Sequence, residues 1–329
     1  MATDNTTSKE VHDLLIVGAG PAALSAAVYT TREDIDTVLY EKGAIGGLAA
    51  VTDLIDNYPG FPDGVTGLDL SEDLRKHAVR FGADIRLGEV LSIKDEGKYK
   101  LVGTTDGDIY AKAVLIATGS DYKKLGIPGE AEFYARGVHY CATCDGAFYR
   151  DKNIVVVGGG NSAVQESLFL TKFAKHIDLL VRSECRASDI LQKELAKNNK
   201  ITVYKNTTTD SIEGADNKVV KVVGTDKTTN KKVEFPTDGV FVFIGLEPNT
   251  QFIANGPVEL NEIGMVKSNE DLETNVPGIF VAGDVREEAT MQIASAVGEG
   301  AKAALMIREY LDGHKHTYSH EMPEAVSVN

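Results

Sequence analysis

Two stretches of the chain share one pattern: an apolar run, a glycine-rich turn, then an alanine-rich helical segment. The first reads HDLLIVGAGPAALSAAVYTTRE at residues 12–33, and the second reads NIVVVGGGNSAVQESLFLTKFA at residues 153–174. A short strand, a glycine turn and a helix are typical of the start of a nucleotide-binding βαβ unit. The repetition of this plan, from Gly18 to Gly158, predicts two similar nucleotide-binding domains.

Further apolar runs, between the two units and after the second, predict additional strands. They are TVLYE (37–41), AVLIATG (113–119), IDLLVR (177–182), GVFVFIG (239–245) and GIFVAGD (278–284). Helical periodicity marks residues 71–83 and 295–311, whereas the polar alternation at 92–110 and 218–235 predicts antiparallel strands. The expected fold class is therefore α/β, with two Rossmann-like, three-layer domains that each carry a smaller antiparallel sheet.

Composition and charge limit the possible partners and compartment. The chain has 329 residues, with 49 acidic and 34 basic side chains, so its surface should repel nucleic acid and anionic membranes. No apolar run reaches the roughly 18 residues that span a bilayer, and MATDNTTSKE lacks the pattern of a signal peptide. We therefore expect a cytoplasmic protein that binds neither nucleic acid nor membrane.

The first glycine turn has the residues that a dinucleotide site needs. Gly18 permits the tight turn, Gly20 lets the backbone approach a pyrophosphate, and Ala23 occupies a third position where only a small residue packs. Glu41 ends the next predicted strand, 21 residues after Gly20, where a carboxylate can bind a ribose diol.

The second turn places Gly158, Gly160 and Ala163 in the same roles, and Asn161 and Ser162 open the following helix. Its distal strand ends in LLVRSECRAS, with Arg182 where the ribose-binding acid would stand. Arginine suits a 2′-phosphate, whereas the nearby Glu184 disfavours one. A solvated arginine surface remains the alternative.

A C-x-x-C pair at Cys141 and Cys144, followed by Asp145, has three possible roles: metal ligand, structural disulfide or redox centre. A reducing compartment favours a catalytic or metal-binding pair over a permanent disulfide. Zinc requires four ligands, and His139 supplies only a third. We expect no metal site, treat Cys185 as a bystander, and interpret the histidine-rich 313–321 segment as a solvated extension. Two dinucleotide sites beside a cysteine pair suggest a flavin supplied with electrons by a pyridine nucleotide.

From about residue 11 to about residue 312 the chain resembles the low-molecular-weight thioredoxin reductases. The resemblance rests on an ordered set of motifs: GAGPAALSAAVY, the glycine pair at 46–47, DNYPGF, ATG at 117–119, CATCDG, GGGNSAVQES, FIGLEPNT and GIFVAGDV. It implies a discontinuous FAD domain at 11–120 plus 249–312, an inserted NADPH domain at 121–248 that carries the cysteine pair, and tails at 1–10 and 313–329.

The resemblance also assigns residues to the cofactors. It implies that Gly18, Gly20, Pro21 and Ala22 lie along the FAD pyrophosphate and that Glu41 holds the adenosine ribose. Around the flavin and its ribityl chain it implies four further residues: Gly47, Asn57, Asp284 and Gln292. For the nucleotide that reduces the flavin it implies six: Gly158, Gly160, Asn161, Ser162, Arg182 and Arg186.

Two departures from the family pattern bear on these assignments. Leu48 and Met291 stand where relatives commonly carry glutamine and arginine, so the polarity around the flavin is expected to differ. The phosphate signature H-R-R-x-x-x-R is shortened here to residues 181–186. Losing one arginine–phosphate hydrogen bond relaxes nucleotide preference by about tenfold or more. We expect NADPH as the donor, with NADH left open.

The resemblance implies an activity and a partner. Cys144 would receive electrons from the flavin, Cys141 would attack the disulfide of thioredoxin or a thioredoxin-like protein, and Asp145 would act as general acid and base. A homodimer is expected, with candidate hinges near 118–124 and 244–249. Two alternatives stay open: a related flavoprotein that takes electrons from reduced ferredoxin, and a flavin-based redox sensor.

Overall fold

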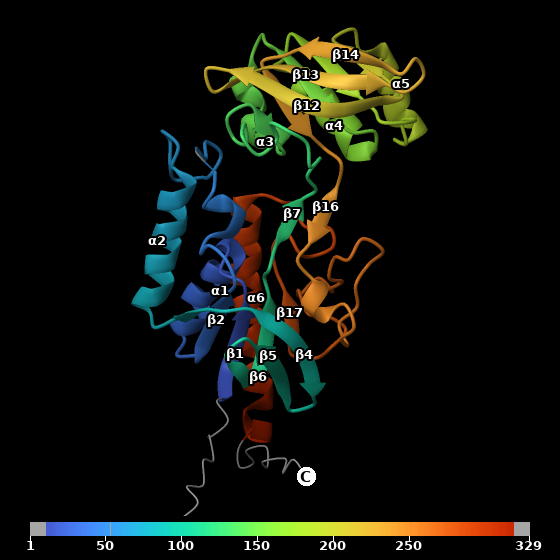
Figure 1. Ribbon diagram of the computed structural model, residues 1–329. Coiled ribbons are helices and arrows are strands. Elements are labelled where there is room, and N and C mark those ends of the chain that lie inside the picture. Colours follow the sequence, from blue (N-terminus) through green and yellow to red (C-terminus); the bar gives the residue numbers. More distant parts are fainter. Residues whose placement is uncertain (1–10, 53, 319–329) are drawn as a thin grey trace, which may run out of the picture. The chain divides into compact units, whose positions relative to one another are not determined.

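The computed structural model describes residues 11–52 and 54–318. By its internal contacts the chain divides into two compact units. Unit 1 comprises Met1–Asp121 and Pro248–Asn329, and unit 2 is the uninterrupted segment Tyr122–Glu247. Figure 1 shows the elements of both units.

The main sheet of unit 1 has the order β3-β2-β1-β6-β5-β4, and β17 also pairs with β6. Its strands are β1 (Val11–Val17), β2 (Thr37–Glu41), β3 (Asp84–Leu87), β4 (Val90–Glu96), β5 (Tyr99–Thr104), β6 (Gly107–Ile116) and β17 (Ile279–Val281). Strand β1 runs parallel to both β2 and β6. Later strands therefore lie on both sides of β1. Ligands of α/β folds bind at the point where the strand order reverses in this way.

Strand β6 has different partners along its length. Its first half pairs antiparallel with β5, and Val114–Ile116 pair in parallel with β17. The carboxyl ends of β1, β6 and β17 therefore lie along one edge of the sheet, as Figure 1 shows.

Alternate residues of β1 pack into different layers. Leu14 and Ile16 pack with apolar residues of helices α1 (Pro21–Thr31) and α6 (Ile293–Tyr318), whereas Leu15 and Val17 pack with β4, β5 and the 252–285 segment. Both sets are fully buried or nearly so. This alternation buries both faces of a mostly parallel sheet and produces the three layers expected of an α/β domain.

Helices α1 and α6 approach closely at one glycine. A Cβ atom at Gly300 would lie 2.1 Å from the carbonyl oxygen of Ala22, so no larger residue fits there without a shift. The packing of α6 fixes the helix that begins at the first glycine turn. The remaining elements of this unit are α2 (Gly67–Arg80), η1 (Gly47–Ala49) and η3 (Gln251–Ile253).

Unit 2 repeats the plan with a five-stranded parallel sheet of order β11-β10-β9-β15-β8. These strands are β8 (Val138–His139), β9 (Asn153–Val157), β10 (His176–Leu180), β11 (Ile201–Tyr204) and β15 (Gly239–Val242). Its helical elements are α3 (Ala142–Asp145), η2 (Gly146–Tyr149), α4 (Asn161–Leu170) and α5 (Asp189–Lys197).

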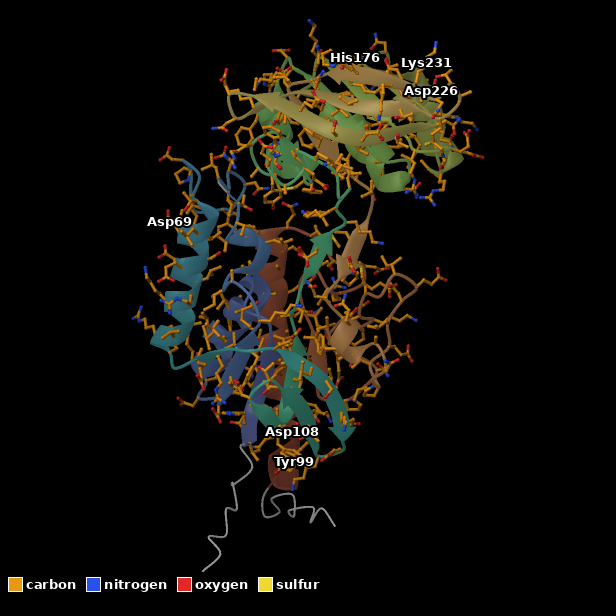
Figure 2. The ribbon with its side chains drawn as sticks, viewed as in Figure 1. Asp69, Tyr99, Asp108, His176, Asp226 and Lys231 are labelled. Atoms are coloured by element: carbon orange, nitrogen blue, oxygen red, sulfur yellow. A yellow bond between two sulfur atoms is a disulfide. The ribbon has the colours of Figure 1, made fainter. Side chains whose placement is uncertain are left out.

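A separate antiparallel sheet covers the other face of the parallel sheet in unit 2. It consists of β12 (Thr207–Ala215), β13 (Lys218–Asp226) and β14 (Lys231–Pro236). Ile154 and Val156 of β9 pack in the core with α4, whereas Val155 and Val157 pack with Ile212 and other residues of this antiparallel sheet. Asp226 and Lys231, paired across the β13–β14 hairpin, lie together at its turn (Figure 2).

The two segments that connect the units pair with each other. Strand β7 (Ser120–Tyr122) and strand β16 (Leu246–Pro248) form a two-stranded sheet. Both fall within the segments expected to contain hinges. Helix α6 runs on to Tyr318, beyond the expected start of the C-terminal tail at residue 313, and the tails at 1–10 and 319–329 lie outside the described residues.

The mixed α/β architecture with two nucleotide-binding folds confirms the expected fold class.

Candidate active site and cofactor-binding turns

The turn after β1 requires glycine at its first position. Gly18 has φ +104°, and a Cβ atom there would lie 2.6 Å from the carbonyl oxygen of Ala117. Its N–H donates to the Tyr40 carbonyl at 2.7 Å, which ties the turn to the end of β2. Gly20 precedes α1 and has open space where a side chain would begin. A phosphate group can therefore approach the backbone at Gly20, which is what a dinucleotide requires.

Glu41 ends β2 and shapes the loop around this turn. Its Oε2 accepts a hydrogen bond from the N–H of Ala19 at 2.8 Å, and its Oε1 accepts one from the N–H of Gly43 at 2.7 Å. It borders a pocket whose walls come entirely from unit 1, lined by Val17, Gly18, Tyr40, Glu41, Lys42, Gly88, Glu89, Val90, Thr118, Asn249, Gln251 and Phe252. A carboxylate beside such a pocket fits a ribose diol.

Pro21 and Ala22 open helix α1 directly after the glycine turn, and Gly20 is the N-cap residue of this helix. Gly47, with φ +56°, begins the short helix η1, and a Cβ there would lie 3.8 Å from the Cα of Gly20. The paired glycines thus lie against the first turn. Leu48 follows in η1 with its side chain partly exposed.

Two predicted flavin residues from distant parts of the sequence meet in the fold. The side-chain amide of Asn57 donates to the side-chain carbonyl of Gln292 at 3.1 Å, and the amide of Gln292 donates to the Met291 carbonyl at 2.9 Å. The pair offers amide groups of the kind that bind the polar edge of a heterocycle.

Asp284 follows β17 at the same edge of the sheet. Burial, together with the negative charge of Glu299, raises the pKa of Asp284 to about 6. Among the described residues no group donates a hydrogen bond to its carboxylate, while Glu299 is held by Arg286 at 2.6 Å and by the N–H of Gly283 at 2.8 Å. A half-buried carboxylate without a donor fits a ligand that supplies hydroxyl groups, such as a ribityl chain.

The second glycine turn has similar geometry. Gly158 has φ +151°, and a Cβ atom there would meet the Phe243 carbonyl oxygen at 2.3 Å. Gly160 precedes α4 with open space around it, and Asn161 and Ser162 open that helix with exposed side chains. Ala163 is fully buried. This turn also fits a dinucleotide phosphate.

Hydrogen bonds fold the loop after β10 back onto this turn. The N–H of Arg186 donates to the Gly159 carbonyl at 2.6 Å, and the side chain of Asn161 accepts from the N–H of Ser188 at 2.8 Å. Arg182 and Arg186 are both exposed on this loop. The loop therefore carries two cations beside the candidate phosphate site.

Two lysines that the sequence did not reveal join the same surface. Lys205 Nζ lies 2.8 Å from Glu184 Oε2, so it offsets the one acidic side chain expected to repel a 2′-phosphate. Lys227 donates from its side chain to the Arg182 carbonyl at 3.4 Å. Lys205 directly follows β11 and Lys227 directly follows β13, and no local pattern in the sequence links them to the arginines.

Cys141 and Cys144 form a disulfide with a Cα–Cα distance of 5.3 Å. The sulfur of Cys141 caps the short helix α3 by accepting a hydrogen bond from the N–H of Cys144 at 3.1 Å. Both cysteines are partly accessible, whereas the third cysteine, Cys185, has its thiol free. A compact, accessible C-x-x-C disulfide suits thiol–disulfide exchange.

Asp145 ends helix α3 and lies beside a buried histidine. Its Oδ2 is 3.1 Å from Nδ1 of His139, whose Nε2 is 2.7 Å from the Tyr149 hydroxyl. The sequence indicated His139 only as a neighbour of the loop. In the described part of the chain, no group of three or more His, Cys, Asp or Glu side chains is arranged to hold a metal ion.

No helix within residues 11–52 and 54–318 is both long and apolar enough to cross a bilayer.

Two dinucleotide-type folds and one accessible C-x-x-C disulfide together define a dinucleotide-dependent disulfide oxidoreductase. The comparison with known sequences agrees, because the pattern of the pyridine nucleotide-disulphide oxidoreductases matches residues 12–300. The chain belongs to this family. Membership implies the use of a flavin and a nicotinamide nucleotide.

Individual relatives are similar along nearly the whole chain. The thioredoxin reductase of Bacillus subtilis (strain 168) is 41% identical over 312 residues, which cover 94% of this chain and 98% of the relative. The crystal structure of thioredoxin reductase from Streptococcus pyogenes MGAS5005 superimposes with a TM-score of 0.89 at 38% identity, covering 93% of this chain and all of the other. The thioredoxin reductase from Giardia duodenalis gives 0.88 at 28% identity, with 92% and 100% covered.

Proposed function

We propose that the protein is a thioredoxin reductase: it passes electrons from a reduced nicotinamide nucleotide, through a flavin and the Cys141–Cys144 pair, to thioredoxin or a thioredoxin-like protein. The observation that carries this proposal is the Cys141–Cys144 disulfide, because it stands beside an acid in a chain with two dinucleotide-type turns. Relatives about 40% identical over nearly the full chain are thioredoxin reductases.

In the overall reaction, one hydride from the nucleotide and one proton reduce one disulfide. Reduced nucleotide, a proton and the partner disulfide yield oxidised nucleotide and two partner thiols. When bound, the flavin and the nicotinamide supply the hydride and two-electron chemistry. The chain's own residues hold the cofactors, carry the dithiol and manage the protons.

FAD is the flavin we propose, held by residues of unit 1. Gly18, Gly20 and the start of α1 would accommodate its pyrophosphate, and Glu41 would bind the adenosine ribose. Asp284 would accept hydrogen bonds from the ribityl hydroxyls, and Asn57 with Gln292 would contact the ring. The space at Gly20 and the Asp284 carboxylate, to which no described residue donates a hydrogen bond, are the observations that support these assignments most directly.

NADPH is the proposed donor, held by the second glycine turn of unit 2. Gly158, Gly160, Asn161 and Ser162 would line its pyrophosphate. Arg182 and Arg186 would contact the 2′-phosphate, supported by the offset of Glu184 through Lys205. NADH remains the alternative donor because one arginine of the family signature is absent.

The cysteines have distinct proposed roles in the transfer to the partner. Cys141 attacks one sulfur of the partner disulfide, and the second partner sulfur leaves as a thiolate and takes a proton. Cys144 then attacks Cys141, which releases the first partner sulfur and re-forms the internal disulfide. Asp145 would hold the proton in transit as general acid and base. From the same family resemblance we propose a cytoplasmic homodimer.

Trapping of the mixed disulfide tests these roles. In Cys144→Ser, Cys141 attacks oxidised thioredoxin but no second thiol resolves the adduct, so a covalent complex should accumulate on non-reducing gels and disappear with dithiothreitol. Cys141→Ser should form no such complex. Adduct formation by Cys141→Ser alone would exchange the two roles, and adducts in neither variant would contradict a C-x-x-C attack on thioredoxin.

An anaerobic titration distinguishes the electron donors. We expect NADPH to bleach the flavin absorbance of the purified protein and sustained turnover to follow when oxidised thioredoxin is added. Bleaching by reduced ferredoxin, with no response to NADPH or NADH, would contradict the nicotinamide assignment. Bleaching without turnover would favour a redox sensor.

A further inference from the structure

Three side chains of unit 2 form a continuous polar chain that starts beside the cysteine pair. Asp145 Oδ2 lies 3.1 Å from His139 Nδ1, and His139 Nε2 lies 2.7 Å from the Tyr149 hydroxyl. His139 and Tyr149 are 8% and 7% exposed, whereas the Asp145 side chain is 20% exposed. These three side chains thus lead from a partly accessible carboxylate into the core of unit 2.

Packing holds the histidine ring in one orientation. The ring of His139 stacks on Phe241 with centroids 5.2 Å apart and meets the edge of Tyr149 at 5.2 Å. Tyr149 is itself tightly confined, since a Cβ atom at Gly239 would lie 2.2 Å from its ring. Both nitrogens of His139 are therefore fixed toward their two partners.

The two partners together favour the tautomer of His139 with its proton on Nδ1, because a carboxylate can only accept whereas a hydroxyl can donate or accept. Burial, followed by the charges of Asp145 and Asp238, raises the pKa of Tyr149, so its hydroxyl stays protonated and is able to donate. If the hydroxyl donates to Nε2, the single proton of the neutral imidazole must lie on Nδ1. That N–H then points at the Asp145 carboxylate.

We infer that His139 is a positioning residue for Asp145: it holds the carboxylate beside the cysteine pair through an Nδ1 proton, while Tyr149 contacts Nε2 of the same ring. The inference deepens the proposed function, because it rests on Asp145 acting as acid and base for the dithiol. In each of the two exchange steps, Asp145 takes the proton of the attacking cysteine and gives it to the departing partner thiolate, so both protons of the dithiol end on the two partner thiols and none is gained or lost overall.

Few charged or titratable groups surround Asp145, His139 and Tyr149. Helix α3 contributes Asp145 and Cys144, and its N-cap residue is Cys141. The short helix η2 contributes Tyr149, and the segment before β15 contributes Asp238. Lys152 lies over the Tyr149 ring at 5.4 Å, and β15 contributes only the apolar ring of Phe241. His139 is thus the one nitrogen base in direct contact with Asp145 among these groups.

Two amide variants separate the two nitrogens of the histidine. In His139→Asn the side-chain N–H₂ is bonded to Cγ, as Nδ1 is, and keeps a donor for Asp145. In His139→Gln the amide reaches the position of Nε2 and contacts Tyr149 but leaves Asp145 without a donor. A role confined to packing would treat these variants alike.

The kinetic test separates kcat from KM in thioredoxin reduction by the holoenzyme. We expect His139→Gln to lower kcat by about tenfold at neutral pH, with KM for thioredoxin unchanged, because one hydrogen bond to the Asp145 carboxylate is lost. His139→Asn should retain most of kcat, and the rate of flavin reduction by NADPH should be unchanged in both.

A spectroscopic measurement keeps the inference testable apart from the enzyme activity. Nitrogen-15 chemical shifts of histidine-labelled protein report which imidazole nitrogen is protonated, and His139→Asn identifies the signal. We expect the proton on Nδ1 in the parent and a redistribution toward Nε2 in Tyr149→Phe, which removes the hydroxyl but keeps the ring.

Two results would overturn the inference. One is the same kcat in His139→Gln and the parent; the other is a His139 proton found on Nε2 in the parent. If the parent fails to reduce thioredoxin, the proposed function fails instead, and the tautomer measurement still decides whether His139 presents its proton to Asp145.

Discussion

The Tyr140 hydroxyl donates a hydrogen bond to Oε1 of Glu130 at 2.7 Å, inside the core of unit 2. Glu130 is 4% exposed, and its carboxylate also accepts from the N–H groups of Leu125 and Gly126, both at 2.7 Å. Burial and the neighbouring Glu130 raise the pKa of Tyr140, so the hydroxyl remains a donor. One buried acid thus links the segment after β7 to the residue that precedes Cys141.

Glu130→Ala should destabilise the protein by about 2–4 kcal/mol, because two backbone N–H groups in part-buried hydrogen bonds and one buried hydroxyl lose their acceptor. Tyr140→Phe is the matched control: it removes only one of the three donors and should cost about 1 kcal/mol. Chemical denaturation followed by far-ultraviolet circular dichroism measures both. Equal costs for the two variants would show that the carboxylate does not organise the segment.

Helix α6 offers a pair of glycines for testing its contact with α1. Gly300→Ala would place a methyl group 2.1 Å from the Ala22 carbonyl, whereas Gly298→Ala meets nothing within 4 Å. We expect Gly300→Ala to cost about 1–3 kcal/mol through overpacking and to lower the flavin content, because the first glycine turn shifts. Gly298→Ala should be neutral or stabilise by about 0.5–1 kcal/mol.

The two glycine variants are compared by thermal unfolding and by the ratio of flavin to protein absorbance. Similar behaviour of both variants would contradict a close approach of α1 and α6 at Gly300.

Asp284 should make the cofactor-free protein less stable as pH rises. Its pKa is about 6 in the folded state against an ordinary value of 3.8, so between these values the folded state binds more protons than the unfolded state. The stability associated with this group is fully present below pH 4 and is lost as pH rises through 6. The total loss is about 3 kcal/mol.

Asp284→Asn removes this titration while keeping the shape of the side chain. Urea unfolding of cofactor-free protein from pH 4.5 to 7.5 should show the variant gaining on the parent as pH rises. A constant difference across that range would mean that the carboxyl is not held in a desolvated position. The same variant should bind FAD more weakly, since the amide replaces a charged acceptor.

The preference for NADPH over NADH should depend on the Glu184–Lys205 pair. Lys205→Ala leaves Glu184 unopposed and should lower the NADPH/NADH ratio of kcat/KM by about two- to fivefold, the modest effect expected at an exposed pair. Glu184→Ala should raise the ratio by a similar factor, and Ser183→Arg should raise it by about tenfold by restoring a phosphate donor.

The double variant Glu184→Ala/Lys205→Ala distinguishes the two roles of the lysine. If Lys205 acts only by offsetting Glu184, the double variant should match Glu184→Ala. A lower ratio in the double variant would instead mean that Lys205 contacts the phosphate directly. Unchanged ratios in all variants would place the 2′-phosphate elsewhere.

Local sequence patterns predicted those features that depend on residues close together in the sequence. The glycine turns at Gly18 and Gly158 could be recognised because a tight turn and a following helix require small residues at fixed spacing. Asn57 and Gln292 were each indicated by a motif, but their mutual hydrogen bond spans 235 residues and depends on tertiary packing.

Other features could not be predicted because strands distant in sequence create them. Glu184 suggested repulsion of a phosphate, yet Lys205 from the end of the next parallel strand offsets its charge. His139 had no distinguishing pattern, since its position between Asp145 and Tyr149 follows from the course of α3 and η2 beside β8. Ion pairs and hydrogen bonds between residues that are distant in sequence depend on the tertiary structure and cannot be recognised from a local motif.

The nested layout gives this chain a simple genetic modularity. The inserted segment starts and ends at neighbouring points of unit 1, where the Thr118 hydroxyl donates to the Asn249 carbonyl at 2.7 Å and the Asn249 N–H donates to the Gly119 carbonyl at 3.0 Å. Because the two ends of unit 2 are close together, a deletion of the whole segment could be closed by a short turn between the two parts of unit 1. The order of the strands in unit 1 would not change. One recombination event of this kind would exchange the proposed donor specificity and the dithiol together while leaving the flavin scaffold's coding sequence untouched on either side.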